Sequence, residues 1–400
     1  MDLTSTHPFW TVKNGLITSY PALRNDVACD IAIVGAGITG SMLAHRLSSD
    51  GYHVVVVDGR DVCTGSTSAS TALLQYEIDV PLVELAKLIG REDAEQAYRL
   101  SHRSIDDLCE LAEAIQTDCG FKRKTSIYLA EDRKSAKLLA DEARARKSIG
   151  LDVTYHDADS LQSTFGLTGV AALSSQQAAS CDPYQLAHAL LKQSTARGAE
   201  IYDRTKVEEF DCSEGGVRLK TTRGPSVSAR NVVIASGYEV YGMLREKVVN
   251  LDNTYALVSA PLDRIEPWNE DWMMWEAKQP YLYLRITNDN RLLVGGEDDA
   301  FHNPKQRDAN LPAKAKSIEQ KVRKLLPRFE WEPEFAWAGT FGKTRDGLAY
   351  IGPSTEYPNC LFALGFGGNG ITFSSIATNL IAQFLKGHVS ENAKLFRFGR

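Results

Sequence analysis

The feature that most constrains the fold is a glycine-rich turn between a short apolar run and a helical pattern. Residues 30–34 form an almost wholly apolar run, as expected for a parallel strand buried on both faces. This run leads into a complete G-x-G-x-x-G over residues 35–40, a helical pattern over 38–49, and four consecutive valines that end at Asp58. Strand, glycine turn, helix, strand and acidic residue together predict one βαβ unit of a dinucleotide-binding fold.

Each part of this unit has a physical role toward a dinucleotide. Gly35 permits the tight turn, Gly37 lets a pyrophosphate approach the backbone, and Gly40 lets helix and strand pack closely. The start of the helix offers unpaired N–H groups and a favourable dipole to the phosphates. Asp58 lies at about the distance expected of the acid that accepts hydrogen bonds from ribose hydroxyls.

A second glycine-rich segment lies near the other end of the chain. Residues 365–370 read Gly-Phe-Gly-Gly-Asn-Gly and precede a closing helix that extends to about Leu385. The first motif alone cannot separate FAD from NAD, because both present the same adenosine and pyrophosphate. A second helix entrance favours FAD, since donors there stabilise the negative charge of a reduced flavin near N1 and O2. A plain glycine loop is the alternative interpretation.

Composition excludes several other classes of function. The formal charge of −6, without a lysine or arginine block, argues against nucleic acid as a partner. No apolar stretch approaches the roughly 20 residues that span a bilayer, and the N-terminus lacks a signal-peptide pattern, so we expect a cytoplasmic protein without an integral membrane segment. The seven cysteines are scattered and contain no C-x-x-C pair, which predicts reduced thiols and no metal site.

With its two ends taken together, the chain resembles the D-amino acid oxidase and glycine oxidase family of FAD enzymes over essentially its whole length. The matching segments are residues 35–40 with Asp58, then 65–70, 182–184, 205–207, 235–237, 345–347 and 365–370. The N-terminal arm and residues 367–370 are most similar to the branch that contains γ-glutamylputrescine oxidase. The resemblance implies oxidation of a C–N bond, with a hydride equivalent passing from carbon to flavin N5 and hydrolysis of the resulting imine.

The resemblance also implies where the cofactor binds. The stretch 65–71 is similar to the segment that passes the flavin ring and pyrophosphate, Val207 to a position that contacts the adenosine half, and 367–372 to the loop that caps the flavin pyrimidine. The expected cofactor-binding residues are Gly35, Gly37, Ile38, Thr39, Gly40, Asp58, Gly59, Arg60, Ser66, Thr67, Ser68, Ser70, Thr71, Val207, Ala235, Ser236, Gly237, Gly339, Gly367, Gly368, Asn369, Gly370, Ile371 and Thr372.

Departures from the family pattern bear on cofactor attachment and substrate. No cysteine stands near Arg345 and Asp346, where sarcosine oxidases attach FAD, so the resemblance implies non-covalent FAD. Glycine oxidase has a carboxylate-binding arginine roughly where this chain has Phe341, and sarcosine oxidase has a lysine near Thr372. Neither familiar carboxylate clamp is present, which puts a simple α-amino-acid substrate in doubt.

Candidate catalytic groups lie on predicted strands of a second sheet. Alternation along 281–285 places Tyr281, Tyr283 and Arg285 on one face, where Arg285 would bind a carboxylate and the tyrosines would wall the pocket. A salt bridge is the alternative for Arg285. Lys343 is expected near the flavin, where a cation could promote reaction with oxygen or bind an anionic group; a solvated strand residue is the alternative. The aromatic stretch 268–275 favours core packing or a subunit interface over a pocket wall.

The expected architecture is α/β, with a Rossmann-type FAD domain and a substrate domain built on an antiparallel sheet. We assign residues 1–80, 150–245 and 332–400 to the FAD domain and 81–149 and 246–331 to the substrate domain. The leading function is a flavin enzyme that oxidises a small amine or amino acid with oxygen. Two alternatives stay open, namely an FAD-dependent dehydrogenase with another acceptor and an NAD-dependent enzyme or nucleotide-binding sensor. The sequence does not predict the oligomeric state.

Overall fold

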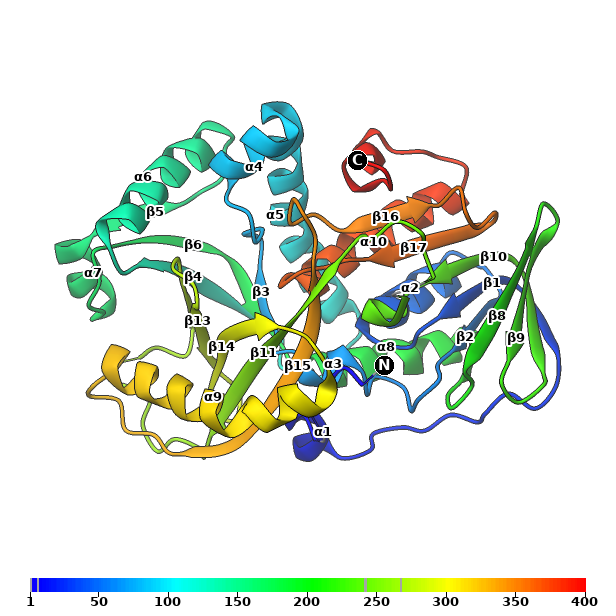
Figure 1. The fold of residues 1–400 in the computed structure, drawn as a ribbon, viewed down its shortest axis with the longest axis horizontal. Coiled ribbons are helices and arrows are strands. Elements are labelled where there is room, and N and C mark those ends of the chain that lie inside the picture. Colours follow the sequence, from blue (N-terminus) through cyan, green and yellow to red (C-terminus); the bar gives the residue numbers. More distant parts are fainter. Residues whose placement is uncertain (1, 6, 241–242, 267) are drawn as a thin grey trace.

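Two large β-sheets lie side by side in the computed structural model, which describes residues 2–5, 7–240, 243–266 and 268–400 (Figure 1). The first sheet has the strand order β16-β17-β10-β1-β2-β7, and β9 and β8 extend it from β10. Its strands are β1 (Val27–Val34), β2 (Val54–Val57), β7 (Glu200–Tyr202), β8 (Val207–Ser213), β9 (Gly216–Thr221), β10 (Ser226–Ile234), β16 (Tyr350–Pro353) and β17 (Cys360–Leu364).

The centre of the first sheet is the predicted βαβ unit. Strand β1 pairs in parallel with β2 on one side and with β10 on the other, and all four valines of β2 are buried. Helix α2 (Ile38–Ser49) connects β1 to β2, as the glycine turn predicts. Strand β16 pairs antiparallel with β17, β9 with β10 and β8 with β9, whereas β7 at the other end pairs in parallel with β2. A Rossmann-type parallel sheet is therefore confirmed, with antiparallel additions.

The second sheet has the strand order β15-β11-β14-β13-β12-β4-β6-β3, with β5 paired to β6. Its strands are β3 (Leu73–Gln75), β4 (Lys122–Ala130), β5 (Thr154–Asp157), β6 (Ala171–Ser180), β11 (Asn250–Ser259), β12 (Trp272–Glu276), β13 (Leu282–Ile286), β14 (Leu292–Ala300) and β15 (Pro333–Lys343). Pairing is antiparallel except between β12 and β4, where it is parallel, so the sheet is mixed rather than wholly antiparallel.

Four strands of the second sheet come from segments that we expected to accompany the cofactor-binding sheet. These are β3, within 1–80, β5 and β6, within 150–245, and β15, within 332–400. Strand β6 pairs with β4, and β15 pairs with β11 along nearly its whole length. Such long-range pairing has no local sequence signal. The division of the chain into domains itself stays a prediction.

Helices flank both sheets. Helices α2, α8 (Pro183–Ala196) and α10 (Gly370–Leu385) pack around the first sheet, while α9 (Pro304–Leu325) packs on β11, β14 and β15 of the second. The remaining helices are α1 (Phe9–Asn14), α3 (Ser66–Ala69), α4 (Leu82–Ile89), α5 (Arg91–Ala114), α6 (Arg133–Ser148), α7 (Ala158–Phe165), η1 (Gly237–Val240) and η2 (Glu391–Phe396). Within the described ranges, no helix has the length and apolar character needed to cross a membrane.

The N-terminal arm ahead of β1 shows no clear periodicity in the sequence, yet its described residues include ordered elements. Thr4 forms an isolated bridge with Gly339 of β15, and the six residues of α1 follow. The Trp10 side chain is buried, and its indole N–H donates to the carbonyl oxygen of Ser70 at 2.7 Å. A helix this short cannot display a repeated apolar face, so its order depends on contacts with distant segments.

We expect Gly40→Ala to destabilise the protein although alanine normally favours helices. A Cβ atom at Gly40 would lie 1.8 Å from the carbonyl oxygen of Gly35, and that backbone cannot move without shifting β1 or α2. Overpacking of this kind costs about 1–3 kcal/mol. Thermal unfolding followed by circular dichroism should show a lower midpoint. Gly215→Ala is the matched control, because its nearest neighbour is the Ser213 hydroxyl at 3.9 Å; equal midpoints for both variants would contradict the prediction.

Candidate functional site

A single large cavity of about 1170 Å³ connects the two sheets. One end is lined by the glycine turn after β1, the end of β2 and the start of β8; the other is lined by β11, β13, β14 and β15. Of the expected cofactor-binding residues, all but Gly40 and Ser68 line this cavity. Gly40 instead packs against Gly35, the role expected of the third glycine, and Ser68 is buried within α3.

The glycine turn brings three backbone segments together. Gly35 has a φ of +108°, and a Cβ atom there would lie 2.4 Å from the carbonyl oxygen of Ala235. Its N–H donates to the carbonyl oxygen of Val57 at 2.8 Å. Only glycine fits this conformation and this spacing. The ends of β1, β2 and β10 therefore meet at the entrance of α2. The N-cap residue of this helix is Gly37, which has no side chain to cap the first N–H groups.

Asp58 directly follows β2 and is fixed by backbone donors. Its carboxylate accepts hydrogen bonds from the N–H groups of Ala36 at 2.8 Å and Arg60 at 2.9 Å. Burial raises the pKa of the Asp58 carboxyl, and these two hydrogen bonds oppose the rise. A carboxylate held on the cavity wall beside a helix entrance can accept hydrogen bonds from a ribose.

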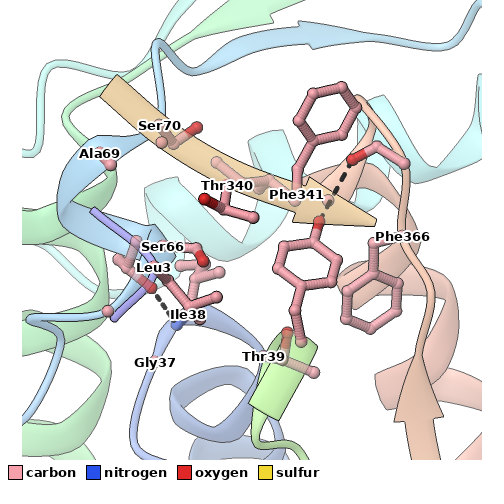
Figure 2. Close-up of a pocket in the computed structure, with 18 of the residues that line it drawn as sticks. Leu3, Gly37, Ile38, Thr39, Ser66, Ala69, Ser70, Thr340, Phe341 and Phe366 are labelled. Carbon is pink, nitrogen blue, oxygen red and sulfur yellow. Dashed lines mark hydrogen bonds between the residues drawn. The ribbon is translucent and has the colours of Figure 1, made fainter. Parts of the chain in front are cut away.

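The segment 66–71 lies against the start of α2. The Thr67 hydroxyl accepts a hydrogen bond from the N–H of Ile38 at 2.9 Å, and Figure 2 shows this contact beneath Ser66. The Ser66 hydroxyl and the Arg60 Nε are buried on the cavity wall and find no hydrogen-bond partner within the part of the chain that the structure describes. Buried donors without partners are costly. A bound pyrophosphate would supply the missing acceptors, which is a fit to a dinucleotide that the sequence motif does not itself show.

The second glycine loop is held by the opposite wall. Gly367 has a φ of +58°, and its N–H donates to the carbonyl oxygen of Gly342 at 3.1 Å. The N–H of Gly368 donates to the Asp79 carboxylate at 2.9 Å, and the Asn369 side chain donates to the carbonyl oxygen of Glu77. These contacts place the entrance of α10 on the cavity.

The entrances of α2 and α10 are neighbours. The hydroxyls of Thr39 and Ser374 lie 2.7 Å apart. Two helix N-termini therefore face one cavity, each preceded by a glycine turn. The amide nitrogen of Gln75 adds a buried donor on the same wall that has no hydrogen-bond partner among the residues with described positions. A cofactor with a pyrophosphate and a second, electron-rich end fits this arrangement.

Aromatic side chains line the cavity at the second sheet. Tyr281 and Tyr283 have ring centroids 6.1 Å apart, and the Tyr283 hydroxyl lies 2.8 Å from the Thr254 hydroxyl. The Tyr283 ring covers Gly295, where a Cβ atom would lie 2.3 Å from the ring. Phe341 of β15 and Phe366 of the glycine loop add apolar surface and are labelled in Figure 2.

Lys343 lies on the cavity wall, as expected, but it is paired. Its ammonium lies 2.6 Å from the Asp252 carboxylate, and about a third of its side chain is exposed. Lys343 is thus partly exposed to solvent, but it is not the free, solvated residue of the alternative interpretation. An ammonium neutralised by a neighbouring carboxylate is a poor partner for an additional anion.

Arg285 does not line the cavity, although Tyr281 and Tyr283 do. Its guanidinium is buried and donates to the carbonyl oxygens of Thr71 and Cys181, each at 2.9 Å. Burial lowers the pKa of Arg285 to about 10, which leaves it charged at neutral pH. Alternation along β13 places Arg285 on the same face of the sheet as Tyr283. Its guanidinium, however, binds the backbone carbonyl of Thr71, and Thr71 itself lines the cavity. The carboxylate clamp and salt-bridge interpretations of Arg285 are both replaced by this positioning role.

The stretch 268–275 divides between core and cavity. Trp268, Met274 and the partly buried Trp272 belong to the hydrophobic core of the second sheet, so the packing interpretation applies to them. Trp275 lines the cavity and stacks on Tyr128 with a centroid distance of 3.5 Å.

Several carboxylates on the cavity wall were not predicted, and Asp79 and Asp298 are two of them. Asp79 follows β3 and contacts the glycine loop, and Asp298 lies on β14. Neither belongs to a motif. Asp298 stands in an acidic run of three residues, 297–299, that resembles a solvated edge, and only strand pairing turns its side chain toward the cavity.

Comparisons with known proteins agree with this geometry. The family model described as FAD dependent oxidoreductase matches residues 30–384. The chain is 22% identical to γ-glutamylputrescine oxidoreductase of Escherichia coli (strain K12), covering 96% of this chain and 89% of that protein, and 26% identical to glycine oxidase of Geobacillus kaustophilus (strain HTA426), covering 89% and 93%. The crystal structure of L-proline dehydrogenase from P. horikoshii superposes with a TM-score of 0.77 at 19% identity, covering 94% and 97%.

We expect Asp58→Asn to weaken FAD binding. The amide would present one donor in place of an acceptor, so a hydrogen bond at the ribose or at the Ala36 or Arg60 N–H would be lost. A hydrogen bond to a charged group is worth about 1.5–3 kcal/mol, which corresponds to a roughly 10- to 100-fold rise in the dissociation constant. Quenching of FAD fluorescence on titration of apoprotein measures this constant. Asp211→Asn is the control, because Asp211 is exposed and lies off the cavity; equal constants for the two variants would refute the assignment.

Proposed function

Because the chain belongs to the family of FAD dependent oxidoreductases, whose model matches residues 30–384, we propose that it oxidises the C–N bond of a small amine or amino acid to an imine. The observation that carries this proposal is the continuity of the cavity. The dinucleotide-binding turn at Gly35 and the aromatic face around Tyr283 line the same space, so a cofactor and a small substrate can meet there. Family membership also excludes the NAD-dependent alternative.

FAD held between the two glycine turns would supply the acceptor for the hydride equivalent that leaves the carbon, and the nitrogen lone pair would then form the C=N bond. The protein residues bind and orient the amine and keep water from the reacting carbon. Tyr281, Tyr283 and Phe341 supply apolar walls for this purpose. Burial raises the pKa values of both tyrosines well above their ordinary range, so their hydroxyls stay protonated and serve as hydrogen-bonding groups rather than bases.

The cofactor is held without a covalent bond in this proposal. Cys63 is the cysteine that lines the cavity among the described residues, and it is buried beside the glycine turn. Burial raises the pKa of its thiol, which keeps it protonated and a weak nucleophile. We also propose a cytoplasmic location, supported by the seven cysteines, all of which are free thiols.

The electron acceptor is oxygen in the leading form of this proposal and another compound in the alternative form. Both forms are compatible with the comparisons, because the chain is similar to a protein named glycine oxidase and to a solved structure of an L-proline dehydrogenase. The rate at which the reduced protein recovers in air distinguishes the two, because only an oxidase reoxidises rapidly with oxygen alone.

We expect an amine or amino acid to bleach the visible flavin band of the purified protein under anaerobic conditions. The panel comprises monoamines, diamines, N-methyl amino acids, proline and D-amino acids, added one at a time. A matched sample with an aliphatic alcohol of the same length reports on oxidation of a C–O bond and should leave the band unchanged. If the alcohol bleaches the band and no nitrogen compound does, the C–N assignment is wrong.

A further inference from the structure

The cavity face of the second sheet holds a carboxylate that has no hydrogen-bond partner among the described residues, although the positive charge of Lys343 acts on it and opposes the rise in its pKa. Both oxygens of Asp298 are buried, and neither has a hydrogen-bond partner among the described residues. The hydroxyls of Thr254 and Tyr281 lie close enough to oppose the rise that burial causes in the pKa of Asp298, but neither completes a hydrogen bond of ordinary geometry. A buried carboxylate without a partner is unfavourable unless something that enters the site pairs with it.

The surroundings of Asp298 suit a cation. Tyr281 and Tyr283 stand beside it on the cavity wall, and the negative charge of Asp298 helps to raise the pKa values of both, which reflects their proximity. Aromatic rings together with a carboxylate are a recurrent site for ammonium groups, because the face of each ring attracts positive charge. Asp79 adds a second carboxylate to the wall, and it contributes to the pKa shift of Tyr281.

No side chain on this part of the wall suits a substrate carboxylate. Among the residues that the structure describes, Lys343 is the cation that faces this end of the cavity, and it is paired with Asp252 at 2.6 Å. Arg285 lies behind the wall and is bound to backbone carbonyls. The balance of charge at the substrate end is therefore negative.

We propose that Asp298, with Tyr281 and Tyr283, binds a cationic nitrogen of the substrate, so that the preferred substrates are diamines or other amines with a second, protonated nitrogen. This inference rests on the proposed function and specifies its substrate class. The nitrogen that is oxidised must be neutral, whereas the nitrogen at Asp298 keeps its proton and its charge. A simple α-amino acid places a carboxylate next to the reacting carbon, and the described cation at this end of the cavity, Lys343, is already paired with Asp252.

Binding of tetramethylammonium tests the subsite without any oxidation. This ion has a permanent charge, and isothermal titration calorimetry or a shift of the visible flavin band of the holoprotein reports its binding. We expect the wild type to bind it and to bind acetate at least tenfold more weakly. Asp298→Asn should raise the dissociation constant of tetramethylammonium by about tenfold or more, while the exposed Asp263→Asn, away from the cavity, leaves it unchanged. Equal binding by wild type and Asp298→Asn, or tighter binding of acetate, would overturn the proposal.

A second variant keeps the test decisive if Asp298→Asn does not fold. Tyr281→Leu removes the ring and leaves the carboxylate, and we expect weaker tetramethylammonium binding with an unchanged flavin content. Reduction by 1,4-diaminobutane and by butylamine, compared anaerobically, then separates the two proposals. If tetramethylammonium binds through Asp298 but no amine reduces the flavin, the proposed oxidation fails and the subsite stands. If both amines reduce the flavin equally well in wild type and Asp298→Asn, the oxidation stands and the subsite fails.

Discussion

The backbone contact between Gly35 and Gly40 is the constraint on which the cavity depends. A missing Cβ at Gly40 lets α2 begin directly against β1, and a missing Cβ at Gly35 lets the carbonyl of Ala235 approach from β10. The entrance of α2 is thereby fixed relative to three strands of the first sheet. The Thr39 and Ser374 hydroxyls, 2.7 Å apart, then fix α10 and its glycine loop relative to α2. The two glycine turns that line the cavity are positioned relative to each other through this chain of short contacts.

Buried charges serve two different purposes in this protein. Arg285 and Arg146 are fully buried and satisfied, the first by the backbone carbonyls of Thr71 and Cys181 and the second by Glu142 at 2.7 Å and Glu77 at 3.4 Å. Glu77 in turn holds the glycine loop, because its carbonyl oxygen accepts a hydrogen bond from Asn369. These charges tie the wall of the cavity to the body of the protein. Asp298 differs because its oxygens have no such partner.

Local sequence signals predicted the parts of the site that interact with neighbours along the chain. The helix over 38–49 and the end of α10 at Leu385 match the structure, because glycine turns and apolar periodicity act within a few residues. The order of the N-terminal arm and the sheet membership of β6 and β15 could not be predicted in this way. They depend on pairing with strands that are distant in sequence, such as the contact between Thr4 and Gly339.

The sequence by itself determined the βαβ unit, the acidic residue at its end and the second glycine loop. These features in turn determined the class of cofactor. They can be recognised in the sequence because the backbone geometry at each place demands a particular residue type. Tertiary structure decided which charged groups reach the cavity. Strand alternation gives the face of Arg285 but not the carbonyls of Thr71 and Cys181 that lie opposite it. Asp298 resembles an ordinary surface acid until β13, β14 and β11 pair, since only their register brings its carboxylate among Tyr281, Tyr283 and Thr254.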